Sequence, residues 1–213
     1  MAEVIPTTAV HICNLALDRL GQRSIASIDT PTTDVETICA RWYPVVRRKM
    51  LRRFIFNFSK KYITLTASVT KIPAFGYTSA YALPNDFVRL LALGDIAIND
   101  DTPPGLYDLS EGYIFTDAGD GGTLKLSYIF DAKDVTKYDA LFIDVFFLCL
   151  ASAMAFKFTL KNSMIREIRD EAGDAAVAAA AVSGQEKPPR RIERSKWLNA
   201  RRGLGGTDHS RLP

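Results

Sequence analysis

The chain has 213 residues, of which 47% are hydrophobic and 24% are charged, a size and composition that suit one globular domain, alone or with a small appendage. Its three cysteines (Cys13, Cys39 and Cys149) form no CxxC pair, and their odd count disfavours a disulfide framework, so we expect reduced, buried thiols. His11 and His209 are the only imidazoles, which disfavours structural zinc and Ser/His/Asp catalysis. We therefore predict no enzymatic activity, no cofactor and no metal.

The net charge of +3 is unevenly distributed along the sequence. From residue 184 to the end there are eight basic and three acidic residues, a net charge of +5 that leaves −2 for the rest of the chain. This distribution predicts a mildly acidic body and a basic C-terminal segment that contacts an acidic partner. The first ten residues lack the basic region and long apolar core of a signal peptide, so we expect none.

Helical spacing of apolar residues predicts a first helix near the N-terminus. Thr7 or Thr8 is placed to cap it, and Gly21 suits the left-handed conformation that ends a helix. The loop that follows contains Pro31, which we expect in the first turn of the next helix.

The stretch from residue 33 to 58 predicts a long second helix with one broad buried stripe. Thr33 and Glu36 form a predicted capping box, and Pro44 predicts a kink or a restart. A basic cluster and then an aromatic run complete the stretch: Arg47, Arg48, Lys49, Arg52, Arg53, Phe54, Phe56 and Phe58.

The middle of the chain changes to the period of β-strands. Residues 62–69 alternate and are rich in β-branched side chains, and a turn is expected at 84–86 before another apolar run. Turn residues then surround two brief predicted strands, near 106–109 and 113–116, and the segment 123–131 alternates again. These segments predict a small β region.

Helical periodicity returns after Asp134. The run 141–156 is apolar on nearly every face but shorter than the roughly 20 residues that span a bilayer, so we predict a central core helix. Asn162 or Ser163 is expected to cap a last, alanine-rich helix that Gly184 ends.

The remaining C-terminal residues are rich in proline, glycine and charge, and cannot fold alone. They include Ile192, Trp197 and Leu198, more apolar surface than a linker needs. One interpretation is a disordered, solubilising end. The favoured one is an arm that becomes ordered on a partner, because tryptophan and arginine are enriched among binding hot spots.

Three segments together resemble a known family. NLALDRLGQRSIASID at 14–29, RRKMLRRFIFNFSKKYITL at 47–65 and YALPNDFVRLLAL at 81–93 are similar to the head-to-tail adaptor proteins of short-tailed phages, often called tail tubular protein A. The resemblance covers about the first half of the chain, and its motifs are structural rather than catalytic.

The fold we expect is mainly α, within the α+β class: a helical bundle core with a small antiparallel β insertion and an extended C-terminal arm. The predicted boundaries are 1–60 with 134–183 for the bundle, 61–133 for the insertion and 184–213 for the arm. The resemblance implies a virion protein, made in the host cytoplasm, that forms a twelvefold ring on the portal. It further implies that the next tail component docks on this ring and that genome DNA passes through its channel without sequence-specific binding.

Two sets of residues are predicted to make these contacts. Arg47, Arg48, Arg52 and Arg53 are candidates for a subunit interface or the channel, although the same cluster, with Lys49, equally suits a solvated helix face that pairs with carboxylates. The predicted portal-binding residues of the arm are Arg190, Arg191, Ile192, Arg194, Lys196, Trp197, Leu198, Arg201 and Arg202.

Other functional interpretations are weaker. GDGG at 119–122 lacks the Lys-Ser/Thr of a phosphate loop, so we predict a hairpin turn there. Asp95, Asp100, Asp101 and Asp108 lack the spacing of a calcium-binding EF-hand loop. Asp117 and Asp120 lie in a turn-rich stretch and suit turn chemistry better than acid–base catalysis.

The main alternative function is a nucleic-acid-binding protein with a basic arm. A tail hydrolase is a third possibility, but it requires a histidine or paired-carboxylate pocket that the sequence does not indicate. No membrane association is expected.

Overall fold

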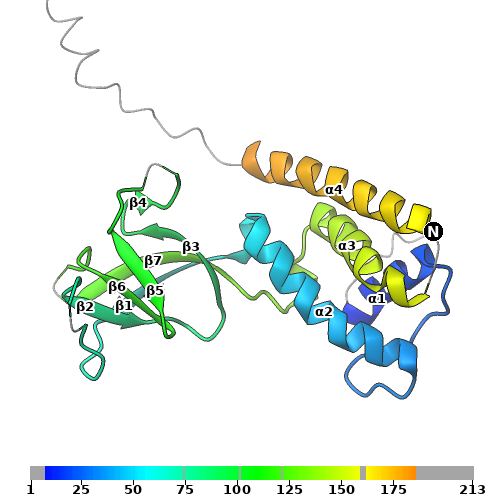
Figure 1. Ribbon diagram of the computed structural model, residues 1–213, viewed down its shortest axis with the longest axis horizontal. Coiled ribbons are helices and arrows are strands. Elements are labelled where there is room, and N and C mark those ends of the chain that lie inside the picture. The colour runs from blue at the N-terminus through cyan, green and yellow to red at the C-terminus, as the bar shows by residue number, and fades with distance from the viewer. Residues whose placement is uncertain (1–7, 74, 101, 121, 159–161, 186–213) are drawn as a thin grey trace, which may run out of the picture.

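The computed structural model describes residues 8–73, 75–100, 102–120, 122–158 and 162–185. The molecule is elongated, with a helical region at one end and a β region at the other (Figure 1). The described helices are α1 (Ala9–Arg19), α2 (Asp34–Arg53), α3 (Ala140–Phe158) and α4 (Asn162–Gln185). Two short 3₁₀ helices, Asn57–Ser59 and Val135–Lys137, lie in the segments that connect the regions.

The predicted caps of the first two helices are confirmed. The Thr8 side chain accepts a hydrogen bond from the backbone N–H of His11, and Thr33 and Glu36 form the full capping box of α2. Pro31 precedes that cap, so the prediction that it begins the helix is wrong. Pro44 lies inside α2, which continues without a restart to Arg53.

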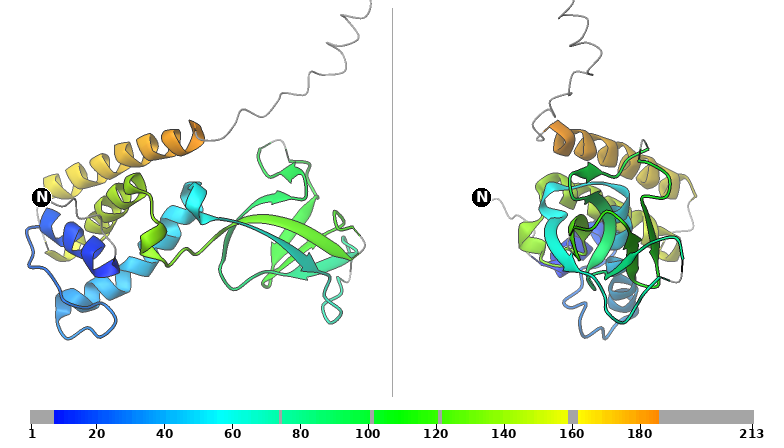
Figure 2. Two further views of the ribbon diagram at one scale, coloured as in Figure 1. Left: turned by 180° about the vertical axis from the view of Figure 1, so that it is seen from behind. Right: turned by 90° about the vertical axis from the view of Figure 1, so that its left-hand side faces the viewer.

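α3 is the centre of the helical region, as its apolar sequence predicts. It packs against α1, α2 and α4, and it lies between α2 and α4 in Figure 1 and in the view from behind (Figure 2, left). Its length and composition would also allow it to cross a membrane, but half of its most apolar stretch is buried inside the protein. Contacts with the other three helices therefore account for its apolar character.

Aromatic rings join α3 to the end of α2. Phe142 of α3 is fully buried and lies 4.8 Å from Phe56, 4.9 Å from Phe58 and 4.8 Å from Tyr138, measured between ring centroids. α2 ends at Arg53, so the aromatic run lies outside the helix. It crosses the base of the helical core as an irregular segment and a 3₁₀ turn.

The β region consists of two antiparallel sheets. One has the strand order β1-β7-β3-β4 and the other β2-β6-β5. Their inward side chains, which include Tyr81, Leu90, Ile114 and Leu124, form a second hydrophobic core. The strands are β1 (Lys60–Thr66), β2 (Ser79–Ala82), β3 (Phe87–Leu93), β4 (Ile96–Ala97), β5 (Tyr107–Ser110), β6 (Tyr113–Thr116) and β7 (Thr123–Phe130).

The prediction of a mainly α fold built on a helical bundle is wrong. The fold is mixed, with 45% helix and 23% strand in two antiparallel sheets. The physical reason is that the strands form more than a small insertion on the helices. Their two sheets pack together around a hydrophobic core of their own.

Candidate protein-interaction surfaces

Arg47 does not lie on the protein surface. Its side chain points into the junction between the two regions, where Nε donates to Oδ1 of Asp131 at 2.9 Å and Nη2 donates to Oδ2 at 3.0 Å. Arg47 is 7% exposed and Asp131 9%, so this is a buried, bidentate pair. The structure thus places Arg47 away from any interface or channel surface of the isolated subunit, because its guanidinium is occupied within the chain.

The junction contains further polar contacts. Nη1 of Arg52 donates to the backbone carbonyl of Val88 at 3.1 Å, and Arg89 of β3 donates to the carbonyl of Arg52 at 3.3 Å. Asp86 accepts from Lys61 at 2.5 Å and from the Tyr128 hydroxyl at 2.9 Å. Burial raises the pKa of Asp86, but these two hydrogen bonds outweigh it and leave the pKa below its usual value. The end of α2 is therefore attached firmly to the β region.

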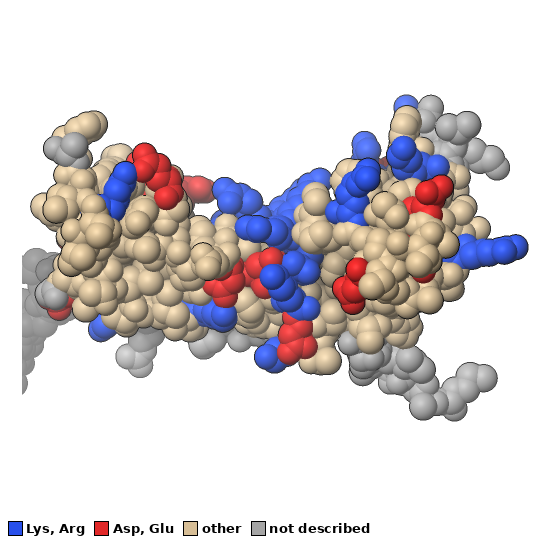
Figure 3. Space-filling view, turned by 90° about the horizontal axis from the view of Figure 1, so that it is seen from below, with Lys and Arg blue, Asp and Glu red and all other residues tan. Residues whose placement is uncertain are grey.

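The other basic residues of α2 form an exposed basic band. Residues 41, 45, 48 and 52 are three or four positions apart and therefore lie on one side of the helix. Residues 49 and 53 widen that side. Figure 3, a view from below, shows lysine and arginine side chains gathered over the middle of the molecule and along the helical region. The exposed members of the band are Arg41, Arg48, Lys49, Arg52 and Arg53, with the half-exposed Val45 among them.

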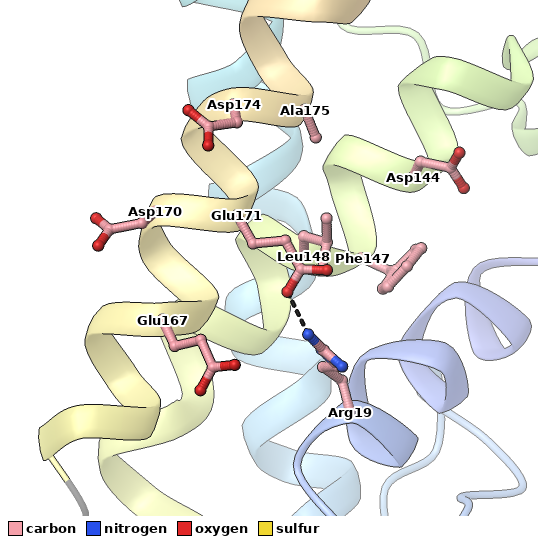
Figure 4. A pocket seen from close by; sticks show the side chains of 9 residues that line it. All are labelled: Arg19, Asp144, Phe147, Leu148, Glu167, Asp170, Glu171, Asp174 and Ala175. Atoms are coloured by element: carbon pink, nitrogen blue, oxygen red, sulfur yellow. Dashed lines mark hydrogen bonds and ion pairs between the residues drawn. The ribbon is translucent and has the colours of Figure 1, made fainter.

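An acidic groove lies between α1, α3 and α4. It has a volume of about 1080 Å³, and Phe147, Leu148 and Ala175 form the apolar part of its lining. Glu171 points across it to Arg19, with which it forms an ion pair, whereas Asp170 points away from α3 (Figure 4). The acidic residues of its lining are Asp144, Glu167, Asp170, Glu171 and Asp174. Partial burial raises the pKa of Asp144 above its usual value.

These two charged surfaces lie on opposite sides of α3. In the close view of the groove, α2 lies behind α3, and α1 and α4 lie in front of it (Figure 4). The basic band and the acidic groove therefore belong to different faces of the helical region, although exposed Arg166 and Arg169 of α4 lie next to the acidic residues of the groove. Sequence analysis found the basic cluster from its composition, but it missed the acidic groove, since its residues come from helices that are separate in the sequence.

The predicted portal-binding arm lies outside the described residues, from Arg190 to Arg202. The described chain ends at Gln185, the last residue of α4. His209 and Asp101, two of the candidates for chemistry, also lie outside the described part, whereas His11 is a half-buried residue of α1.

The remaining candidates for chemistry have structural roles where they are described. Two backbone hydrogen bonds between Asp120 and Thr123 close a tight turn at the glycine-rich stretch, and no helix follows it. Asp117 accepts hydrogen bonds from the backbone and hydroxyl of Thr78 at 2.7 Å, which lower its pKa. Within the described ranges, no three potential metal ligands lie together. Cys13 and Cys39 are buried and Cys149 is half-buried, all three as free thiols.

No protein-family model matches the chain, and no curated protein matches it.

Proposed function

We propose that the chain is a structural virion protein: a head-to-tail adaptor that forms a ring, with twelve copies, on the portal of a tailed phage. The resemblance in the first half of the chain supports this proposal. The structural observation that carries it is the basic band on one side of α3 and the acidic groove on the other. Opposite charges on different surfaces of one subunit favour contacts between different surfaces of identical copies, and such contacts form a ring when the rotation between neighbours closes.

The C-terminal arm is proposed to bind the portal ring. It begins where α4 ends, and its sequence combines nine basic or apolar candidate residues, from Arg190 to Arg202, around Trp197. Arginines can make bidentate pairs with carboxylates, and a tryptophan can fill an apolar pocket. The β region then faces the next tail component, and the ring extends the channel through which DNA passes. This role requires no reaction and no cofactor.

Electron microscopy of the purified chain mixed with isolated portal rings tests the proposal. We expect an additional ring of density on one face of the portal. Truncation after Gln185 is expected to abolish binding without changing the unfolding transition, whereas truncation after Arg202, which keeps every predicted arm residue, is expected to preserve binding. Failure of the intact chain to bind portal rings would reject the adaptor role.

The exposed basic band on α2 supports one competing function, nucleic-acid binding. Neutralising phosphates with five basic side chains makes affinity fall steeply with salt. Titration of duplex DNA with the chain at low and at moderate salt distinguishes the two functions. Strong, salt-dependent DNA binding together with no portal binding would favour the nucleic-acid role.

A further inference from the structure

The loop between β1 and β2 has an exposed apolar tip. Val69 is 89% exposed, Ile72 74% and Phe75 89%, and all three occur within seven residues. Side chains of this kind are singly common on protein surfaces, but a cluster of them indicates an interaction site. The loop projects from the sheets on the side away from α4 (Figure 1).

The base of this loop is held in place. The hydroxyl of Ser68 accepts hydrogen bonds from the backbone N–H groups of Thr70 and Lys71, at 3.3 and 3.0 Å. Lys71 forms an ion pair with Glu111 of the turn between β5 and β6. Asp117 holds the other end of the loop through Thr78. A fixed base with apolar side chains in solvent reduces the entropy lost when a partner binds.

A groove of about 1180 Å³ crosses the four-stranded sheet. All four of its strands contribute to the lining, and Gly184 near the end of α4 borders it. Its apolar lining includes Ile55, Tyr62, Ile63, Leu91, Ala97 and Ile98. Tyr62 is 77% exposed, whereas the other five apolar residues of the lining are half-buried.

The charges around the loop and around the groove are complementary. Two carboxylates, Glu111 and Asp117, flank the base of the loop, and because Lys71 of the loop pairs with Glu111, the three charges together leave one net negative charge there. Two lysines, Lys60 and Lys125, line the groove, together with one carboxylate, Asp95. Carboxylates beside the loop oppose an anionic lipid surface but favour a protein surface that carries lysines.

We propose that the β1–β2 loop of one copy packs its apolar tip into the groove of a second copy. The loop and the groove border opposite sides of the β region, since the loop projects away from α4 and Gly184 of α4 borders the groove, so one chain cannot close the contact on itself. The contact joins two different surfaces, so each copy binds one neighbour through its loop and another through its groove. This inference rests on the proposed function and deepens it, because it supplies a contact between adjacent subunits of the ring.

Cysteine cross-linking of the purified full chain tests this contact. Thr70 is exposed beside the tip and Thr64 is exposed in the groove, so both can be replaced without removing the apolar residues. Under mild oxidation, a mixture of Thr70→Cys and Thr64→Cys chains is expected to give a covalent dimer, and the doubly substituted chain a ladder of oligomers. The unsubstituted chain is the control for its own thiols, two of which are buried.

Phe75→Ser tests the role of the apolar tip, with Phe156→Ser as the matched control. Phe156 is 75% exposed at the end of α3, far from the loop in sequence and in the fold. We expect Phe75→Ser to reduce the yield of cross-linked dimer more than about tenfold, as for a central binding residue, and Phe156→Ser to leave the yield unchanged.

Three results would overturn the proposal. One is a Thr70→Cys chain that pairs with itself as readily as with Thr64→Cys, which indicates a symmetric contact. Another is an intrachain disulfide in a Thr64→Cys/Trp197→Cys chain while the Thr70→Cys/Thr64→Cys chain gives no ladder of oligomers. This result assigns the groove to the chain's own C-terminal residues. The third is binding to anionic vesicles that requires Phe75, again with no ladder. Portal binding without the ladder rejects this contact alone, and the ladder without portal binding rejects the adaptor function alone.

Discussion

The helical and β regions each have a hydrophobic core, but the two cores are built differently. In the helical region, one predominantly apolar helix packs against three others and is joined to the connecting segments by contacts between aromatic rings. In the β region, short strands from two sheets enclose a smaller set of side chains, and the pairing of β3 with β7 is interrupted by register shifts. Most of the buried hydrophobic side chains therefore belong to the helical core, whereas the loop with the exposed Val69, Ile72 and Phe75 belongs to the β region.

Two segments, 54–59 and 131–139, connect the regions. The first leads into β1 and the second follows β7, and these two strands form an antiparallel pair in which Lys60 lies opposite Ile129. The junction is therefore a covalent and hydrogen-bonded base for the whole β region. Whether the two cores unfold together depends on this base. Trp42 reports on the helical region, so its fluorescence in a Trp197→Phe chain shows whether a change in the β core is transmitted to the helices.

The largest effect is expected from Phe142→Ala. This change removes a fully buried ring that contacts four other aromatic side chains, and we expect a loss of about 4 kcal/mol in the free energy of unfolding. Urea denaturation followed by Trp42 fluorescence measures it. Leu124→Ala in the β core is the matched change. If the regions unfold as one unit, Leu124→Ala also shifts the Trp42 transition, and an unshifted Trp42 transition would show that the regions unfold separately.

Arg47→Ala is expected to cost roughly 3 kcal/mol, because it leaves the buried carboxylate of Asp131 without its partner. The exposed neighbour Arg48→Ala is the control and is expected to change stability by less than about 0.5 kcal/mol. Replacing both partners, as Arg47→Met/Asp131→Leu, is expected to recover most of the loss. Equal effects of Arg47→Ala and Arg48→Ala would show that the buried pair does not stabilise the junction.

Sequence analysis predicted the helical region better than the β region for a physical reason. Helix periodicity and caps are local, so Thr8, Thr33 and the apolar run of α3 could be recognised from neighbouring residues. Sheet pairing is not local: β7 lies between β1 and β3, and β6 between β2 and β5, which alternation within a segment does not reveal.

The same limit applies to the candidate surfaces. The basic cluster on α2 is contiguous in the sequence and was found, but only the fold shows that Arg47 points inward toward Asp131, 84 residues later. The acidic groove joins Arg19, Asp144 and Glu171 from three helices, and the apolar groove joins four strands. Neither leaves a pattern in the order of the residues. The exposed apolar loop at 69–75 could have been suspected only from its turn-rich composition.

The dependence of the free energy of unfolding on pH tests the Glu36 carboxylate at the start of α2, far from the junction. Hydrogen bonds from the backbone and hydroxyl of Thr32 and from the backbone of Thr33 lower the pKa of Glu36 from 4.5 to about 2. Because the folded-state pKa is depressed, the stabilisation is present above pH 4.5 and is lost as pH falls toward 2. We expect Glu36→Gln to flatten this part of the curve, measured by urea denaturation between pH 5 and pH 2. An unchanged slope would mean that other carboxylates dominate the acid response.

The smallest effect is expected from Thr33→Ala, which removes the oxygen that accepts from the backbone N–H of Glu36. Loss of such a cap costs about 1 kcal/mol. The Glu36 carboxylate still accepts from the backbone of Thr32 and Thr33, so half of the capping box survives the change. Thr8→Ala at the start of α1 is the matched variant, since that cap has no reciprocal glutamate. Because α1 and α2 both contact α3, we expect both small losses to shift the transition followed by Trp42 fluorescence.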